Sequence, residues 1–296
     1  MTRLGIYDAL AQRCADAVVR AYSTSFGLAT RTLPTVQRTH IRNVYGLVRL
    51  ADEVVDGAAA EAGGDRRRAL DLLEEDVVSA VATGYSTNVL VHAFALTARQ
   101  VGIGADLFTP FFASMRMDLD RADHDAESFA TYVYGSAEVV GLMSLRVFLS
   151  GEPAFRREER YAQLAPSAQA LGAAFQKINF LRDLADDGER LGRSYFPGVD
   201  LRAFTEADKE RILADIDADL VLAATGMEAL PPTSARAVRV AHGLFAELAR
   251  RLRDTPATEL TRARVRVPGP VKARIAAAAL TPRPRARAER SGGAGR

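Results

Sequence analysis

Apolar residues recur at spacings of three and four along most of this chain, and this period restricts its fold more than any other feature. Such spacing puts the apolar side chains on one face of a helix, and strand-like alternation bounded by turn signals is nearly absent. We therefore expect helices over ten segments: residues 4–22, 36–57, 66–82, 87–102, 106–120, 127–150, 157–187, 206–224, 233–254 and 269–279.

Glycine and proline residues mark the places where these helices should break. They stand at Pro34, 63–64, Pro110, 151–153, 196–198, 231–232 and 268–270. Thr205, followed three residues later by Asp208, can begin a helix with a capping arrangement. Because the chain has 48% hydrophobic residues, no internal repeat and no linker, we predict one all-α domain over residues 1–280.

Residues 281–296 differ from the rest, because they hold five arginines against one glutamate, with Pro and Gly and no apolar face. We expect this segment to be a disordered basic tail. It is either a solvated end of the chain or a segment attracted to an anionic membrane surface. Such attraction contributes on the order of 1 kcal/mol of binding free energy per basic residue.

The charge balance gives no support for nucleic-acid binding, since the chain carries 39 basic and 37 acidic residues and lacks zinc-finger spacings. Cys14 is the only cysteine, which excludes an intramolecular disulfide and fits a reducing cytoplasm. The sequence shows no secretory signal and no uncharged apolar stretch of about 18 residues.

Two aspartates four residues apart, Asp52 and Asp56, lie in "RLADEVVD", within an otherwise apolar helical segment. This spacing puts both carboxylates on one helix face, one turn apart. Glu53 points about 100° away, either beside the pair or into solvent. Like charges one turn apart repel each other unless a cation lies between them, so the pair indicates a cation site.

A second cluster, "NFLRDLADD", repeats this arrangement with Asp183 and Asp187. Gln176 and Asn179 lie two turns and one turn earlier on roughly the same stripe. The stripe therefore runs amide, amide, carboxylate, carboxylate along a helix with apolar flanks. Asp186 is offset from the stripe and is an auxiliary candidate.

A lone acidic pair of this kind usually lies in solvent, whereas two pairs, each in an apolar segment and each beside an arginine, indicate function. The arginines are Arg49 and Arg182. Carboxylates suit Mg²⁺, which prefers oxygen ligands and bridges to substrate phosphates, and arginines bind phosphate bidentately. We therefore predict a magnesium-bound diphosphate between two facing clusters, stabilised as a leaving group. No phosphate-binding glycine loop supports nucleotide hydrolysis.

The order of the motifs resembles that of the squalene/phytoene synthase family of head-to-head prenyl transferases. "YGLVRLADEVVDG" (45–57) and "LGAAFQKINFLRDLADDGERLGRSYFP" (171–197) resemble the two aspartate-rich signatures of the family. Shorter matches are "YSTSF" (22–26), "MRMDL" (115–119), "YVYGSAEVVGLM" (132–143) and "RVRVP" (264–268). The resemblance covers about residues 15–275.

This resemblance implies a single all-α isoprenoid synthase domain, a helical bundle with a central cavity. It also implies a reaction in which two allylic prenyl diphosphates are joined 1′-1 through a cyclopropyl diphosphate, which ionises, rearranges and loses a proton. The implied cofactor is Mg²⁺, with Mn²⁺ as an alternative, and phytoene formation requires no NADPH.

The resemblance also implies roles for individual residues. Asp52, Asp56, Asp183 and Asp187 would bind magnesium-diphosphate, with Asn179 as a further metal ligand. Tyr132 matches a tyrosine near the carbocation, where its ring stabilises positive charge and its hydroxyl accepts or relays a proton. The implied catalytic residues are Tyr132, Arg49, Asp52 and Asp183, and the implied substrate-binding residues are Ser23, Phe26, Tyr45, Arg49, Gln176, Asn179, Arg182 and Tyr195. For Tyr132, Ser23 and Gln176 a purely structural role is the alternative.

Two positions depart from the family pattern. Glu138 stands where the family usually has glycine, so its carboxylate must be paired, exposed or functional. Glu259 lies near a place where many relatives carry an aromatic residue, which puts a pocket-wall role there in doubt.

The substrate length is judged from Phe26 and Thr30, which are four apart and could form the cavity floor. The small Thr30 leaves depth for a long substrate, which favours condensation of two geranylgeranyl diphosphates via prephytoene diphosphate to phytoene, in carotenoid biosynthesis. The alternatives are the same chemistry on farnesyl diphosphate, giving dehydrosqualene or squalene, and a non-catalytic relative that binds prenyl lipid.

The expected product is a water-insoluble hydrocarbon. We therefore expect a cytoplasmic protein in peripheral contact with the inner face of the cell membrane. Its expected partners are prenyl diphosphates, membrane lipid and other enzymes of the carotenoid pathway, and not nucleic acid.

Overall fold

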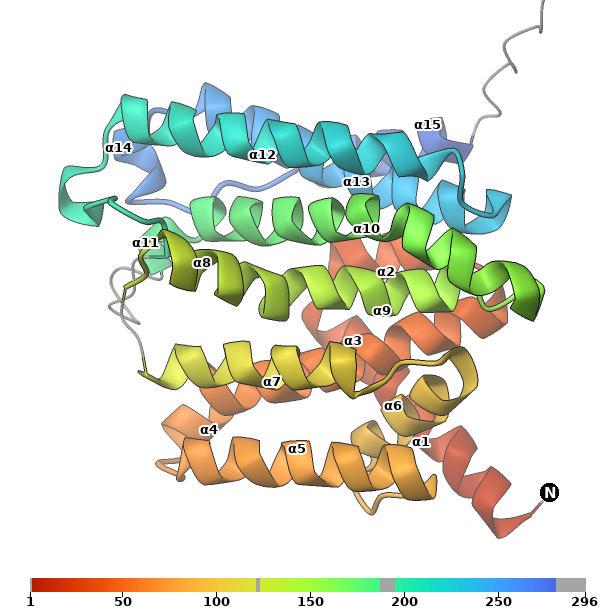
Figure 1. The fold of residues 1–296 in the computed structure, drawn as a ribbon. Coiled ribbons are helices and arrows are strands. Elements are labelled where there is room, and N and C mark those ends of the chain that lie inside the picture. Colours follow the sequence, from red (N-terminus) through yellow and green to blue (C-terminus); the bar gives the residue numbers. More distant parts are fainter. Residues whose placement is uncertain (1, 121–122, 187–194, 281–296) are drawn as a thin grey trace, which may run out of the picture.

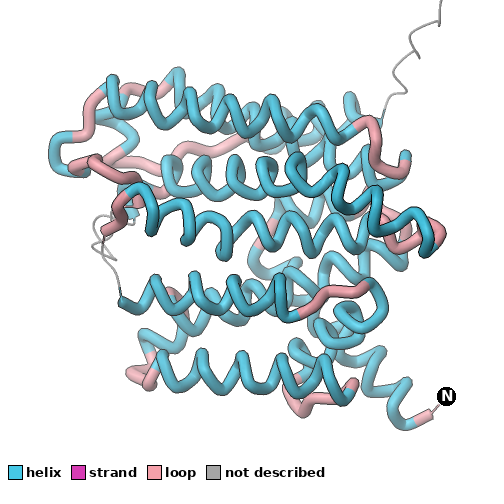
Figure 2. Tube along the Cα trace, in the orientation of Figure 1, coloured by secondary structure: helices cyan, strands magenta, loops and turns pink. Residues whose placement is uncertain are grey.

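The computed structural model describes residues 2–120, 123–186 and 195–280, and this part of the chain is helical without a strand (Figure 1; Figure 2). The all-α prediction is therefore confirmed. The first half contains α1 (Arg3–Tyr22), α2 (Thr24–Thr30), α3 (Thr35–Val55), α4 (Ala58–Glu61), α5 (Arg66–Thr83), α6 (Val89–Val101), α7 (Ala105–Asp120) and α8 (Ala126–Val133).

The second half begins with a π-helical turn, η1 (Tyr134–Glu138), which joins α8 to the next helix. It is followed by α9 (Val139–Phe148), α10 (Ala154–Arg182), α11 (Leu184–Asp186), the 3₁₀ turn η3 (Leu201–Ala203), α12 (Glu206–Met227), α13 (Pro232–Asp254), α14 (Ala257–Leu260) and α15 (Gly269–Leu280). The predicted tail, 281–296, lies outside the described residues, so the domain boundary at residue 280 stays a prediction.

Three helix predictions are wrong in detail. Pro110 does not break a helix but lies inside α7. It is the sixth residue there, so its missing N–H removes a hydrogen bond only from the first turn. The segment 127–150 is interrupted by η1. The helix expected over 157–187 begins at Ala154 and ends at Arg182, because Asp183 leaves the helical conformation with φ −101° and ψ 12°.

The predicted cap at Thr205 is confirmed. The Asp208 N–H donates to the Thr205 hydroxyl at 3.1 Å, and the Thr205 N–H donates to the Asp208 carboxylate at 3.2 Å. These reciprocal bonds satisfy two backbone donors at the start of α12. Asp125 and Ser128 form a similar box at the start of α8.

The core consists mainly of two apolar clusters. One joins α3, α5, α6, α7 and α9 around the fully buried Phe94 and Phe112. The other joins α10, α12 and α13 around Ile178, Leu181 and Leu213. Burying each such side chain contributes roughly 1.5–3 kcal/mol. Between the clusters, η1 packs closely on α10, since a Cβ at Gly172 would lie 2.4 Å from the carbonyl oxygen of Ala137.

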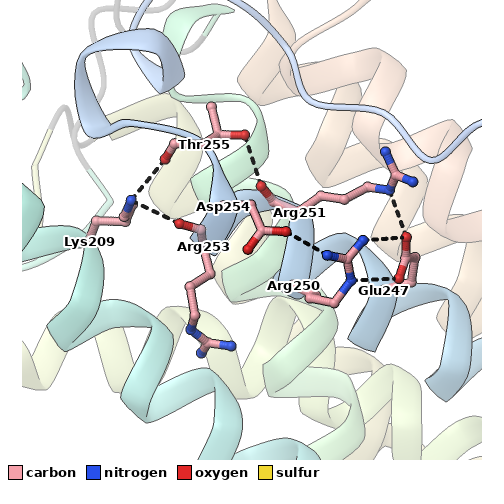
Figure 3. A network of polar contacts seen from close by, with 7 residues as sticks. All are labelled: Lys209, Glu247, Arg250, Arg251, Arg253, Asp254 and Thr255. Atoms are coloured by element: carbon pink, nitrogen blue, oxygen red, sulfur yellow. Dashed lines mark hydrogen bonds and ion pairs between the residues drawn. The ribbon is translucent and has the colours of Figure 1, made fainter.

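The C-terminal end of α13 is held by a buried lysine (Figure 3). The Lys209 ammonium on α12 donates to the carbonyls of Arg253 at 3.1 Å and Thr255 at 2.8 Å. These are carbonyls that a helix end leaves without an intrahelical donor. Nearby on α13, Glu247 accepts hydrogen bonds from Arg250 and Arg251.

The C-terminal ends of α3, α7 and α10 lie at the same end of the bundle, on the left in Figure 1, where α8 begins. The sequence places an aspartate at or near each of these three ends. The fold therefore gathers the acidic segments that are far apart in the chain.

Candidate active site

A cavity of about 930 Å³ runs through the bundle and is lined by residues from α2, α3, α7, α8, η1, α9, α10, α12, α13 and α15. This volume is near the upper end of the roughly 300–1,000 Å³ typical of ligand pockets. Charged side chains line one part of it, and apolar side chains such as Leu33, Phe148 and Leu164 line the rest. The cavity can hold a large ligand that has a charged head and an apolar body.

The cavity brings together most residues that the sequence predicted. Its lining includes Ser23, Thr30, Tyr45, Arg49, Asp52, Asp56, Tyr132, Gln176, Asn179, Arg182, Asp183 and Tyr195. Asp187 lies outside the described residues, and so do the side chains of Phe26 and Asp186. The two acidic segments therefore face one cavity, as predicted, while the roles of the individual residues stay predictions.

Arg49 is the centre of the first acidic segment. Its guanidinium forms ion pairs with Asp52 and Glu53 and lies over the Tyr22 ring, 4.1 Å from the ring centroid. Burial alone would lower the pKa of Arg49, but the two carboxylates outweigh this effect and raise the pKa. Arg49 therefore stays charged at the cavity wall.

Glu53 faces away from the cavity, as its angular offset predicted, and is not part of the cavity lining. Its carboxylate accepts a hydrogen bond from the Ala58 N–H at 2.9 Å and pairs with Arg49. Burial would raise the pKa of Glu53, but these hydrogen bonds lower it overall. Glu53 thus joins the start of α4 to the arginine that lies beside Asp52.

Asp183 is the C-cap residue of α10 and is held by two arginines. Arg182 Nε donates to its Oδ1 at 2.8 Å, and Arg264 Nε forms an ion pair with the same oxygen at 2.7 Å. Arg264 comes from "RVRVP", and no site role was assigned to it from the sequence. The two residues are 81 positions apart, so no local spacing could have linked them.

The acidic end of the cavity has a strongly negative backbone environment. Asp56 caps α3, Asp183 caps α10, and Asp118 lies in the last turn of α7. A helix C-terminus carries the equivalent of roughly −0.5 elementary charge, which adds to the charge of each carboxylate. Three such helix ends favour the binding of cations.

Asp118 is a cavity residue that the sequence analysis quoted in "MRMDL" but did not select. It is 6% exposed and lines the cavity. The Tyr132 hydroxyl donates to Asp118 Oδ2 at 2.8 Å, and the Tyr195 hydroxyl donates to Oδ1 at 3.3 Å. Its signal in the sequence is weak, because the other acids of α7, Asp106 and Asp120, do not lie four residues from it as in the two predicted pairs.

An aromatic cluster surrounds these phenols. The Tyr195 ring stacks on Phe180 with centroids 3.9 Å apart, and the rings of Tyr132 and Tyr195 are 5.5 Å apart. Burial, followed by the negative charge of Asp118, raises the pKa of Tyr132 well above its ordinary value. Tyr132 is therefore a neutral phenol, and it is one of the residues that line the cavity.

The two departures from the family pattern lie away from the cavity lining. Glu138 accepts a hydrogen bond from Gln169 Nε2 at 3.0 Å, which makes it paired, and burial raises the pKa of its carboxyl group. Glu259 is exposed on α14.

No three His, Cys, Asp or Glu side chains among residues 2–120, 123–186 and 195–280 gather closely enough to hold a metal ion by themselves. The oxygen donors that the cavity does present, carboxylates and amides at two helix ends, are those that Mg²⁺ prefers. Magnesium also binds through few protein ligands when substrate phosphates supply others. The donor set therefore fits magnesium that is shared with a phosphate ligand.

The arrangement of helices matches that of solved structures. A dehydrosqualene synthase in complex with a ligand has a TM-score of 0.75 at 19% identity, with 92% of this chain and 96% of that chain covered. Squalene synthase HpnC from Alicyclobacillus acidocaldarius has a TM-score of 0.72 at 22% identity, with 85% and 97% covered. The chain thus has the helical isoprenoid synthase fold.

Within that fold class, the squalene/phytoene synthase family model matches residues 19–270, and the chain belongs to this family. It is 34% identical over 198 residues to a phytoene synthase of Arthrospira platensis, covering 64% of this chain and 63% of the relative. It is 31% identical over 198 residues to a 15-cis-phytoene synthase of Synechocystis, covering 65% and 57%. The chain thus aligns with less than two thirds of the length of either relative.

None of the helices in the described part of the chain is both long and apolar enough to cross a membrane.

Proposed function

We propose that this chain joins two molecules of geranylgeranyl diphosphate head to head, through prephytoene diphosphate, to phytoene. The observation that carries this proposal is the division of the 930 Å³ cavity into a charged end and an apolar remainder. A prenyl diphosphate is divided in the same way. The similarity to proteins named phytoene synthase supports the 20-carbon substrate.

The charged end would bind the diphosphate heads. Asp52 and Asp56 on α3, and Asn179 and Asp183 on α10, would hold Mg²⁺, or Mn²⁺ as an alternative, and Asp187 completes the predicted set. When bound, the metal supplies positive charge that stabilises the departing diphosphate. Arg49, Arg182 and Arg264 would bind the remaining phosphate oxygens, because guanidinium groups match phosphate geometry.

The apolar part would enclose the prenyl chains and exclude water from the carbocations. The buried Tyr132 is part of the cavity lining. The negative face of an aromatic ring stabilises nearby positive charge. The chain's own contribution is thus to hold the heads, shape the tails and stabilise the cation.

Condensation of farnesyl diphosphate is the second candidate function. The observation that favours it is the pair of bulky side chains, Phe148 and Leu164, that line the cavity. They come from the end of α9 and the first half of α10, at the other end of the bundle from Asp183. They limit the length of chain that fits, whereas the small, buried Thr30 extends it.

The test supplies each prenyl diphosphate separately, with and without Mg²⁺ and with and without NADPH, and identifies the products by mass spectrometry. We expect phytoene from the 20-carbon substrate, only with the metal and without reductant. If only the 15-carbon substrate is turned over, the proposal of phytoene synthesis is wrong and condensation of farnesyl diphosphate is the function. Asp52→Ala and Asp183→Ala should abolish diphosphate release, and Asp71→Ala is the matched control, because Asp71 on α5 pairs with Arg116 and is not part of the cavity lining. Release that persists unchanged in both variants would favour the non-catalytic alternative.

Contact with the cytoplasmic face of a membrane is proposed because the product is insoluble in water. Co-sedimentation with anionic vesicles should be stronger for the full chain than for a chain truncated at residue 280, since five arginines are removed with the tail. Equal binding of the two chains would exclude a role for the tail.

A further inference from the structure

Asp118 occupies an unusual position for a carboxylate, because it is only 6% exposed although it lies at the acidic end of the cavity. Both of its oxygens accept hydrogen bonds from phenols, Oδ2 from Tyr132 at 2.8 Å and Oδ1 from Tyr195 at 3.3 Å. The shorter bond joins α7 to α8, whose residues are 14 positions apart here. A buried carboxylate needs such partners, and these ones fix the rotation of both hydroxyl groups.

The bond to Asp118 determines what the Tyr132 hydroxyl offers to the cavity. A phenol has one proton, and here that proton is donated to Asp118. The phenol oxygen therefore has only lone pairs left for a ligand. Because burial and the charge of Asp118 raise the pKa of Tyr132, the group remains a phenol and does not become a phenolate. A neutral phenol is a weak base unless its own proton can leave as another arrives.

We propose that Asp118 is a positioning residue that orients the Tyr132 hydroxyl and receives its proton when Tyr132 deprotonates a carbocation in the cavity. This proposal rests on the proposed prenyl-condensation function. A C–H bond beside the cationic carbon breaks, and its electron pair forms the second bond of a new carbon–carbon double bond. The released proton binds the Tyr132 oxygen, the original hydroxyl proton passes to Asp118, and the carboxylic acid later returns it through Tyr132 to water.

The structure favours this path over direct proton transfer to Asp118. Tyr132 lines the cavity, and its side chain has both a ring face, which attracts a cation, and a hydroxyl oxygen. The 2.8 Å distance between the Tyr132 oxygen and Asp118 Oδ2 is that of a well-formed O–H···O⁻ bond, along which a proton can move. Asp118 thus acts through the tyrosine.

The test measures two products of one reaction: diphosphate released, which reports ionisation, and hydrocarbon formed, which reports proton loss. Asp118→Asn keeps the size of the side chain and its acceptor for Tyr132 but cannot take up a proton. We expect the ratio of hydrocarbon to diphosphate to fall at least tenfold, with alcohols from water capture in its place. Asp71→Asn makes the same chemical change outside the cavity and should leave the ratio unchanged.

Tyr132→Phe is the second variant, and it tests the proposal if circular dichroism shows that Asp118→Asn does not fold. It should lower the same ratio, and combining the two substitutions should lower it no further, because they interrupt one path. An unchanged ratio in either folded variant would overturn the proposal. So would a proportional loss of diphosphate and hydrocarbon, which would assign Asp118 to substrate binding. A wild-type chain that releases no diphosphate from any prenyl substrate would instead overturn the proposed function.

Discussion

Gly135 lies where η1 crosses α7, at the junction that positions Tyr132 relative to Asp118. A Cβ at Gly135 would lie 2.2 Å from the carbonyl oxygen of Pro110 and 2.1 Å from the Ser114 hydroxyl oxygen. The serine can rotate away, but the carbonyl belongs to the backbone of α7. Gly135→Ala should therefore force α7 and η1 apart.

The size of this effect follows from the distances. Ordinary Cβ contacts begin at 3.4 Å, whereas the new Cβ would lie 2.2 Å from the Pro110 carbonyl oxygen. The backbone of α7 must therefore move away from η1 by roughly 1 Å. Overpacking of this kind costs about 1–3 kcal/mol, and alanine regains up to about 1 kcal/mol by its helix propensity. We expect a net loss of about 1–2 kcal/mol. A rigid shift of that size would also stretch the 2.8 Å bond between Tyr132 and Asp118 beyond hydrogen-bonding distance.

Urea denaturation measures the stability of Gly135→Ala, and a crystal structure measures the separation of Tyr132 and Asp118. Gly151→Ala is the matched control, because nothing lies within 4 Å of a Cβ there and its φ is not positive. That variant should stay within about 0.5 kcal/mol of the wild type. If Gly135→Ala is as stable as the control and keeps the 2.8 Å bond, the packing argument is refuted.

Three further predictions concern charged groups outside the cavity. Burial raises the pKa of Glu138 in the folded chain, so ionisation of this carboxyl group opposes folding as pH rises through the folded pKa. Glu138→Gln should therefore raise Tm at pH 8. A gain in Tm that persists below the unfolded pKa of about 4.3 would contradict this explanation. The hydrogen bond from Arg250 lowers the pKa of Glu247 to about 2, although burial opposes this shift. The ionised Glu247 therefore stabilises the fold above the unfolded pKa, and this contribution is lost as pH falls toward 2. Glu247→Gln should therefore cost at most about 1 kcal/mol at pH 7 in urea melts, and a cost that does not shrink in acid would argue against the ion pair. Lys209→Met should cost about 1–3 kcal/mol by the same assay, because two buried carbonyls lose their donor, and equal stability would show that they find another.

The helices and the two acidic segments could be predicted because their signals are local. Periodic apolar residues define a helix face over a few turns, and the spacing of Asp52 and Asp56 defines which face carries the charge. Each segment also carries an arginine beside its aspartates, and this combination suits one shared metal-bound diphosphate. The prediction that the two segments share a cavity follows from it, and the cavity lining confirms that they do.

The details that could not be predicted depend on contacts between distant segments. The π turn at η1 inserts one residue into a helical register, and this depends on packing against α7 at Gly135. The end of α10 at Arg182 depends on the partners of Asp183, one of which is Arg264. The importance of Asp118 depends on two tyrosines from other segments. Apart from Arg182, none of these partners lies within one helical turn of the residue concerned.

The ion pairs at the acidic end of the cavity suit the diphosphate ligand that is proposed for it. Helix ends and carboxylates repel one another there, and Arg49 and Arg264 offset this repulsion by pairing with Asp52 and Asp183. If cations bind these carboxylates as proposed, the arginines can transfer their hydrogen bonds to the phosphate oxygens of the incoming substrate. Each guanidinium then has a charged partner in both states, so binding leaves no partly buried charge without compensation. If Arg49 and Arg264 bind phosphate as proposed, the pairs that orient their guanidinium groups place them at the site before the substrate arrives, which lowers the entropic cost of binding.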